Sequence, residues 1–475
     1  MQAIKHRCAR ALVSSAAVMV AVLLASTRAE AIPAYARKYK TSCQTCHIAY
    51  PKLNPFGEAF RLRGYRMPAE TEDQIKETPV SLGAPGYKRL WPDAVWPSDM
   101  PGTLPLSLDT TFTNLSSHRS GGDHGDETIK NDFRFPEEVG VLWGGTLGET
   151  LSFFGEVAFK QEAGEGHSGL ELEMEHGQLN FNGLFGSGTA FNLKIGRFAP
   201  EITQPISHSH LLTTGGPAPL LQFVPIAAHG GSQVGGHDAT GIALPHSVDG
   251  LEVYGILRHR VLYSAGLANG LGPGDESMDG NDAKDVFGRV AFKIGGLPLD
   301  GEGFTPSDKN WQERSLTLGV FAYRGDGSGV LARGQGHHAD ELIEDRTFTR
   351  VGFDVSVFFQ DLNLLAGMVR GRDTLAEYEE MAGHGDEVEV EFTGEDDFTY
   401  RTWFVEADYV AKPWLHGALR YEWLDPANQR QPSFKRIVPN VTALIRANVK
   451  AYFEYQRNLG ENDDYVVIGG LRFAF

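Results

Sequence analysis

Two cysteines and a histidine near the start of the chain have the spacing of a cofactor-attachment motif. The stretch Thr41–Tyr50 reads TSCQTCHIAY and contains Cys43, Cys46 and His47. In a CxxCH motif the two thiols add across the vinyl groups of haem as thioethers, and the adjacent histidine ligates the iron. We therefore predict one covalent haem c, attached through Cys43 and Cys46, with His47 as the proximal iron ligand.

Two other uses of this motif are less favoured. A thioredoxin-like dithiol would require a βαβ context, which the surrounding sequence does not show. A zinc site would require a second pair of cysteines or histidines nearby. The chain has only one further cysteine, Cys8, in the basic N-terminal residues.

The sixth ligand of the iron is open at this stage. Met67 follows soon after the motif, and a thioether ligand would raise the reduction potential of a histidine-ligated haem. We predict Met67 as this ligand, so that His47 and Met67 would both bind the metal. Met100 and His118 are rivals, and an open or water-bound position is a further alternative.

A short helix is expected directly after the motif. Asn54 is a good N-cap, Pro55 suits the first helical position, and Gly64 suits the position just past the end. We expect a helix over about 55–63. Two aromatic residues share one face of it and would either cover the haem or form ordinary core. They are Phe56 and Phe60.

The N-terminus has the features of a secretory signal. A basic start is followed by a short apolar stretch and by the small-residue pattern Ala29-Glu30-Ala31. We predict a signal peptide over residues 1–31 and a mature chain that begins at Ile32. The remainder has no run of about 18 apolar residues, so no membrane-spanning helix is expected.

The charge is distributed unevenly. The formal net charge is −18. Residues 32–100 carry ten basic and seven acidic side chains, whereas residues 101–475 carry 29 basic and 53 acidic ones. An acidic region of this size argues against nucleic acid as a partner and favours the attraction of cations.

After Pro101 the hydrophobic pattern has period two. In Val351–Phe359, for example, apolar residues occupy the odd positions and Gly, Asp and Ser the even ones. Such strands could build a soluble sandwich or a membrane barrel. Lengths near ten residues, aromatic residues near strand ends, long Gly-, Asp- and His-rich loops and a final Phe475 favour the barrel.

Seventeen segments show this character. Bacterial single-chain barrels have even strand numbers, so we expect about 16 strands and one surplus segment in the 239–257 region. The segments are 103–114, 137–144, 151–161, 170–182, 190–198, 239–246, 249–257, 260–269, 284–294, 313–323, 347–359, 362–371, 398–410, 414–424, 434–441, 446–457 and 464–475.

Several histidine- and acid-rich loops could bind metal. Their spacing is not diagnostic, and solvated loops without a specific site are the favoured interpretation. The loops are Gly121–Glu127, His208 with His210, Gly336–His338 and Gly383–Glu387.

The motif, the segment PKLNPFGEAFRLRGY that follows it and the barrel pattern together resemble the fused monohaem cytochrome–porins of bacterial outer membranes. This family includes proposed extracellular iron oxidases. The resemblance implies a small α-helical c-type cytochrome domain over 32–100, lodged in or at the mouth of an all-β transmembrane barrel over 101–475. It also implies electron transfer from an outside donor, Fe(II) in the best-known branch, through the haem to a periplasmic c-type cytochrome.

Two alternative functions remain at this stage. The protein could be a porin whose haem domain plugs or gates the pore without a role in extracellular oxidation. It could also be a soluble periplasmic cytochrome whose β-domain binds a partner. The main prediction is an electron-transfer protein in outer-membrane lipid that oxidises an extracellular donor, above all Fe(II), and an Fe(II) oxidase activity is one form that it could take.

Overall fold

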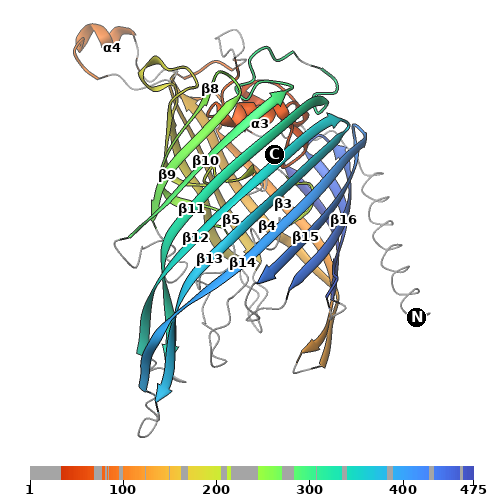
Figure 1. The fold of residues 1–475 in the computed structure, drawn as a ribbon. Helices are drawn as coiled ribbons and strands as arrows, with labels where there is room; N and C mark the ends of the chain where they lie inside the picture. The colour runs from red at the N-terminus through yellow and green to blue at the C-terminus, as the bar shows by residue number, and fades with distance from the viewer. Residues whose placement is uncertain are drawn as a thin grey trace.

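Most of the chain forms one closed antiparallel β-barrel of 16 strands (Figure 1). The computed structural model describes residues 34–68, 77–80, 83, 85–95, 100–122, 125–148, 150–161, 170–204, 211–214, 244–269, 283–305, 307–333, 340–381, 389–426, 433–460 and 464–475. The predicted signal peptide lies outside these residues.

Each barrel strand pairs with its neighbours along the chain, and the last strand, β18, closes the barrel against the first, β3. The strands are β3 Leu106–Gly122, β4 Gly125–Leu147, β5 Leu151–Gln161, β6 Leu170–Phe181, β7 Asn192–Phe198, β8 Val248–Leu257, β9 Val261–Asn269, β10 Lys284–Gly295, β11 Glu313–Arg333, β12 Asp340–Gln360, β13 Leu362–Met381, β14 Glu389–Lys412, β15 Leu415–Pro426, β16 Phe434–Arg446, β17 Val449–Asn458 and β18 Tyr465–Ala474.

The predicted strand number is confirmed. The surplus segment is 239–246, in the region where one was expected. Residues 244–247 are not in a strand, and β8 begins only at Val248. Residues 239–243 lie outside the described part of the chain.

The barrel wall is apolar outside and charged inside. On β10, Val290 and Phe292 point outward with 52% and 46% of their surface exposed. Arg289 and Lys293 point inward and are only 4% and 7% exposed. A soluble sandwich has the opposite arrangement, whereas an outward apolar band around a polar interior is typical of membrane barrels. This polarity argues against the soluble alternative.

The two ends of the barrel differ. At one end the strands are joined by short turns, such as the single residue Asp361 between β12 and β13. At the other end, strands β11 to β14 extend beyond their neighbours (Figure 1). The long connection between β7 and β8 folds partly inward, because Ile202, Leu211 and Leu244 belong to the same buried apolar cluster as strand residues such as Phe287.

The N-terminal segment lies inside the barrel, near the short-turn end (Figure 1). It contains α2 (Ala34–Lys38), the 3₁₀ helix η1 (Cys43–Thr45), the small hairpin β1 (His47–Ala49) and β2 (Lys52–Leu53), and α3 (Pro55–Leu62). The predicted helix is therefore confirmed as α3. A further short helix, α4 (Pro85–Leu90), lies outside the barrel at the same end. Among the helices in the described residues, none is long and apolar enough to span a membrane.

Contacts of this segment reach strands on opposite sides of the barrel. The Lys52 ammonium forms a buried ion pair with Asp408 on β14. The Tyr50 hydroxyl donates a hydrogen bond to Asp109 on β3, at 3.2 Å. Leu62 packs in a buried cluster with apolar residues from β8, β9 and β10. Residues 34–68 therefore cross the lumen rather than rest on its rim.

Candidate cofactor site

One cavity in the lumen brings together the residues of the motif. Its volume is about 240 Å³, and Cys43, Cys46, His47 and Met67 all contribute to its wall. Aromatic side chains form much of the remaining wall, which gives the cavity an apolar character suited to a flat, largely apolar ring system. These aromatic residues are Tyr35, Tyr39, Tyr50, Phe60, Tyr65, Trp143, Phe154 and Tyr254.

The candidates for the sixth ligand differ in position. Met67 lines the cavity, whereas Met100 and His118 do not. Met100 instead pairs with Val80 in an isolated β-bridge and is 47% exposed. His176, on β6, also lines the cavity and was not considered from the sequence. Its place in the segment 170–182 is the only sequence signal that could have drawn attention to it. The geometry thus favours Met67 over the two earlier rivals and adds His176.

Local hydrogen bonds hold the motif against helix α3. The Asn54 side chain caps α3 by accepting from the Gly57 N–H at 2.8 Å. The same side chain donates to the carbonyls of Gln44 and Thr45, at 3.2 Å and 3.0 Å. A Cβ at position 57 would lie 2.0 Å from the Cys46 carbonyl oxygen, so glycine is required for this approach. One asparagine and one glycine therefore fix the helix to the CxxCH turn.

His47 is oriented as a metal-ligating histidine usually is. Its Nδ1 lies 2.9 Å from the Pro51 carbonyl oxygen, which makes Nδ1 the protonated nitrogen. Nε2 then keeps its lone pair for a metal, and the backbone carbonyl fixes the ring. Burial lowers the pKa of His47 to about 4, so the imidazole is neutral at physiological pH, as ligation requires.

The two cysteines do not resemble a redox dithiol. They are not joined in a disulfide. Burial raises the pKa of both thiols, that of Cys46 to about 12, whereas a reactive thiol needs a lowered pKa. Zinc is also disfavoured, since no compact set of metal-ligating side chains in the described residues includes Cys43 or Cys46. The donor set and the apolar cavity fit a covalent haem.

The two phenylalanines of α3 have different environments. Phe60 lines the cavity, with its ring centroid 5.5 Å from that of Tyr35 and 5.8 Å from that of Tyr39. Phe56 does not line it and packs on Phe304, at 4.0 Å between ring centroids. Phe60 therefore belongs to the wall of the CxxCH cavity, and Phe56 belongs to the contact between α3 and the β10–β11 connection.

The loops considered for metal binding have side chains outside the described residues. Where side chains are described, two other groups bring three possible ligand atoms within 4.8 Å of one another. Neither was identified from the sequence, since each combines residues from separate positions in the chain. The two groups are Glu156 with Glu175 and His176, and His259 with Asp300 and Glu302.

Comparison with known proteins gives likenesses to solved barrels only. No family model and no curated protein matches the chain. OmpF of Salmonella typhi, solved with daunomycin, has 12% identity, a TM-score of 0.48, and coverage of 80% of this chain and 98% of its own. The anion-selective porin of Comamonas acidovorans has 12% identity, a TM-score of 0.47, and coverage of 78% and 99%. The outer-membrane channel DcaP of Acinetobacter baumannii has 11% identity, a TM-score of 0.47, and coverage of 83% and 100%. At these scores the likenesses say nothing about function, and the porin-like character of the fold rests on its own closed 16-strand topology.

Proposed function

We propose that this protein is a bacterial outer-membrane electron-transfer protein that holds a single c-type haem inside its barrel. It would oxidise an extracellular donor, Fe(II) above all, and pass electrons to a periplasmic c-type cytochrome. The observation that carries the proposal is that Cys43, Cys46, His47 and Met67 line one cavity within the lumen.

Each of these residues has a distinct role. Cys43 and Cys46 would hold the haem through thioether bonds, and His47 would offer Nε2 to the iron while Pro51 fixes its ring. Met67 would offer its sulfur to the iron. A haem bound here would supply one-electron redox chemistry, and the surrounding aromatic rings would limit the access of water.

The position of the cavity suits transfer across the membrane. In outer-membrane barrels the short turns face the periplasm and the longer loops face outward. The N-terminal segment lies near the short-turn end (Figure 1), so an acceptor protein would dock there. The hydrocarbon layer is about 30 Å thick, so a donor must enter the lumen from the loop side. The acidic composition of residues 101–475 would attract a cationic donor.

A second function is favoured by a different observation. A closed 16-strand barrel is also the architecture of diffusion porins. The N-terminal segment crosses the lumen and is anchored by the buried Lys52–Asp408 pair. The protein would then be a porin whose haem-bearing segment plugs or gates the pore without a role in extracellular oxidation.

Haem staining of denaturing gels tests the first step of the proposal. Wild-type protein from outer-membrane fractions should stain for covalent haem and should migrate differently after heating in detergent, as folded barrels do. Cys43→Ser and Cys46→Ser should lose the stain. Cys8→Ser is the matched control, because Cys8 lies in the predicted signal peptide, and it should keep the stain. Undiminished staining of the first two variants would refute the assignment.

Rapid mixing with Fe(II) separates the two functions. For an electron-transfer protein, the ferric haem spectrum should convert to the ferrous spectrum on mixing. For a gated porin, Fe(II) should leave the spectrum unchanged, and loosening the segment with Lys52→Met should increase single-channel conductance.

A further inference from the structure

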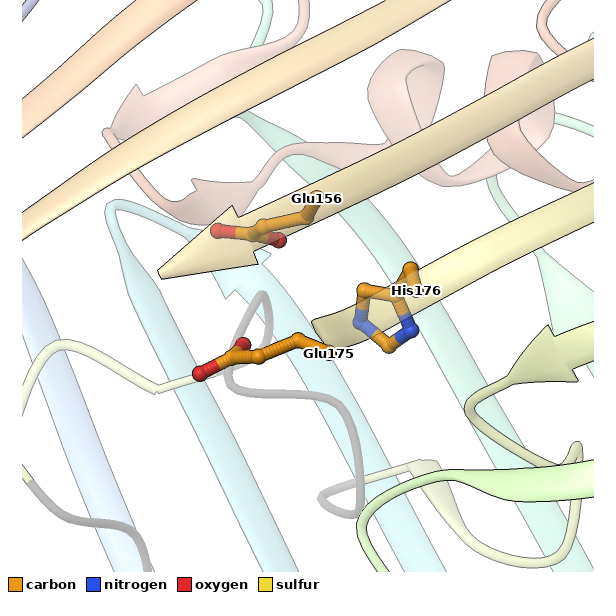
Figure 2. Close-up of side chains that lie close together, drawn as sticks. All are labelled: Glu156, Glu175 and His176. Carbon is orange, nitrogen blue, oxygen red and sulfur yellow. The ribbon is translucent and has the colours of Figure 1, made fainter. Parts of the chain in front are cut away.

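Three side chains that could bind a metal meet on the inner face of two neighbouring strands. Glu156 comes from β5, and Glu175 and His176 come from β6 (Figure 2). One ligand atom from each lies within 4.8 Å of the other two. Two carboxylates and one imidazole form a mixed set that suits divalent first-row transition metals such as Mn(II), Fe(II) and Co(II).

A β-bulge makes this arrangement geometrically feasible. In the β5–β6 ladder, Glu156 pairs with His176 and Val157 pairs with Met174, so the pairing skips Glu175. In a regular strand, adjacent residues would point to opposite faces. Here Glu175 and His176 both face the lumen, where they line one cavity. Bulges often re-aim side chains next to functional sites.

Outward residues on both sides of the bulge show the change of phase. Leu172 and Met174 point outward, with 63% and 50% of their surface exposed. Before the bulge the outward residues are therefore even-numbered. Beyond the bulge the outward residue is the odd-numbered Leu179, which is 43% exposed. The alternation therefore shifts by one residue within β6.

Glu156 supplies a second, independent observation. Its side chain is buried, with 4% of the residue exposed. No hydrogen bond or ion pair joins it to any other residue in the described part of the chain. A buried carboxylate without a partner is costly, and a bound cation would supply the missing charge. The nearby Arg472 guanidinium, which faces the same cavity, is held by Asp109.

The cluster lies where two cavities meet. Glu156 and His176 line the cavity of the CxxCH motif. All three residues line a second cavity of about 540 Å³, whose wall contains many charged side chains. Five glutamates face this second cavity, against three basic side chains, so its field favours cations. The glutamates are Glu137, Glu138, Glu156, Glu173 and Glu175, and the basic residues are Lys160, Lys450 and Arg472.

Lys160, which pairs with Glu175, can keep an acidic partner when a cation binds Glu175. The Lys160 ammonium lies 2.7 Å from the Glu175 carboxylate and 2.6 Å from that of Glu173. If a cation takes Glu175, Lys160 keeps Glu173. Glu173 has the same charge, lies on the same strand and pairs with the same lysine, but it lies outside the cluster. Glu173→Gln therefore separates the loss of a metal ligand from the loss of one acidic charge.

The second three-residue group does not offer a comparable site. His259 already uses Nδ1 toward Asp300 and Glu302, at 2.6 Å and 2.9 Å, and the histidine and Glu302 are exposed. This arrangement is a surface ion-pair network that needs no metal. His259 is useful as a second control.

We propose that Glu156, Glu175 and His176 form a binding site for one divalent transition-metal cation, on the polar side of the CxxCH cavity. The cation enters from the acidic cavity and is held beside the cavity that contains Cys43, Cys46 and His47. The identification of Fe(II) as the natural occupant rests on the proposed function, whereas the binding of a divalent transition metal does not.

Titration of the full-length protein in detergent with Mn(II), followed by electron paramagnetic resonance, tests the site. Wild-type protein should bind one Mn(II) with a nitrogen coupling from histidine. Glu156→Gln and His176→Gln should weaken this binding at least tenfold, and His176→Gln should remove the nitrogen coupling. His259→Gln should bind Mn(II) as wild type does. Glu173→Gln should weaken the binding less than Glu156→Gln does, because it removes an acidic charge and one partner of Lys160 but no metal ligand.

Two outcomes would overturn the site. One is wild-type protein without nitrogen coupling, a measurement that needs no variant to fold. The other is an equal loss of binding in Glu156→Gln and Glu173→Gln, which would indicate a diffuse acidic field. Heat-modifiable migration of each variant verifies that its barrel is folded.

Failure of the site and failure of the proposed function are distinguishable. Cys43→Ser lacks covalent haem under the proposed function but should still bind Mn(II), so the site can be tested without the cofactor. A further outcome is that Fe(II) reduces the haem of Glu156→Gln as fast as it reduces the haem of the wild type. In that case the proposed function stands, and Fe(II) is not the natural occupant of this site.

Discussion

Lys52 in the N-terminal segment and Asp408 on β14 form an ion pair inside the barrel, although 356 positions separate them in the chain. Both side chains are only 2% exposed. This contact joins the CxxCH segment to the barrel wall at a point shielded from water. Removal of one member of a buried pair leaves the other charge unpaired and costs about 3–5 kcal/mol.

We therefore expect Lys52→Met to destabilise the docked segment by roughly that amount, about 3–5 kcal/mol. The double variant Lys52→Met/Asp408→Leu should recover most of the loss, because neither charge remains. Denaturant titration in detergent, read as a double-mutant cycle, measures both values. The control is Asp132→Asn, which removes an ion pair with Arg134. Because the Asp132 side chain is 40% exposed and that of Arg134 is 22% exposed, this variant should lose only about 0–1 kcal/mol of stability. A double variant as unstable as the single one would contradict the expected pairing.

Gly57→Ala should disturb cofactor attachment without touching any ligand. The new Cβ would lie 2.0 Å from the Cys46 carbonyl oxygen, so α3 would have to move away from the motif. We expect a marked loss of haem stain per barrel. Gly86→Ala in α4 is the matched control, because a Cβ there meets nothing within 4 Å. Equal staining of the two variants would show that the close approach of α3 is not needed for attachment.

Met67→Ala should lower the reduction potential of the bound haem and remove the sulfur-to-iron absorption band. The reason is that Met67 lines the cavity and its thioether favours the reduced iron. Met100→Ala, outside the cavity, should leave both properties unchanged. Redox titration with optical detection measures them. If only His176→Gln changes the spectrum, the sixth ligand is the histidine on β6 instead.

Reduction by Fe(II) should depend on ionic strength. Residues 101–475 have an excess of 24 acidic over basic side chains, and their field enriches cations at the barrel mouth. Because added salt shortens the screening length from about 30 Å at 0.01 M to about 8 Å at 0.15 M, haem reduction by Fe(II) should slow. Reduction by ferrocyanide, an anion, should speed up over the same series. Stopped-flow measurement of the haem reduction rate across a salt series tests this expectation. If the rates with Fe(II) and with ferrocyanide changed with salt in the same way, an electrostatic role of the acidic barrel would be excluded.

The sequence by itself determined the features that depend on near neighbours. Alternation along each strand is a local property of period two, so the number of strands could be predicted. The CxxCH spacing is likewise local, as are the N-cap Asn54, the following Pro55 and the terminating Gly64, which together predicted α3. The segment 239–246 also showed the strand pattern, but its described residues 244–246 are not in a strand. This surplus could be recognised from the sequence because bacterial single-chain barrels have even strand numbers.

The tertiary structure alone decided which distant residues meet. The phase shift at Glu175 depends on how β6 pairs with β5, and no periodicity in one strand reveals a pairing that skips a residue. The burial of Lys52 against Asp408 and the presence of Met67 and His47 in the wall of one cavity both require the barrel to close around the N-terminal segment. Closure sets contacts across hundreds of residues, and local propensities carry no information about these contacts.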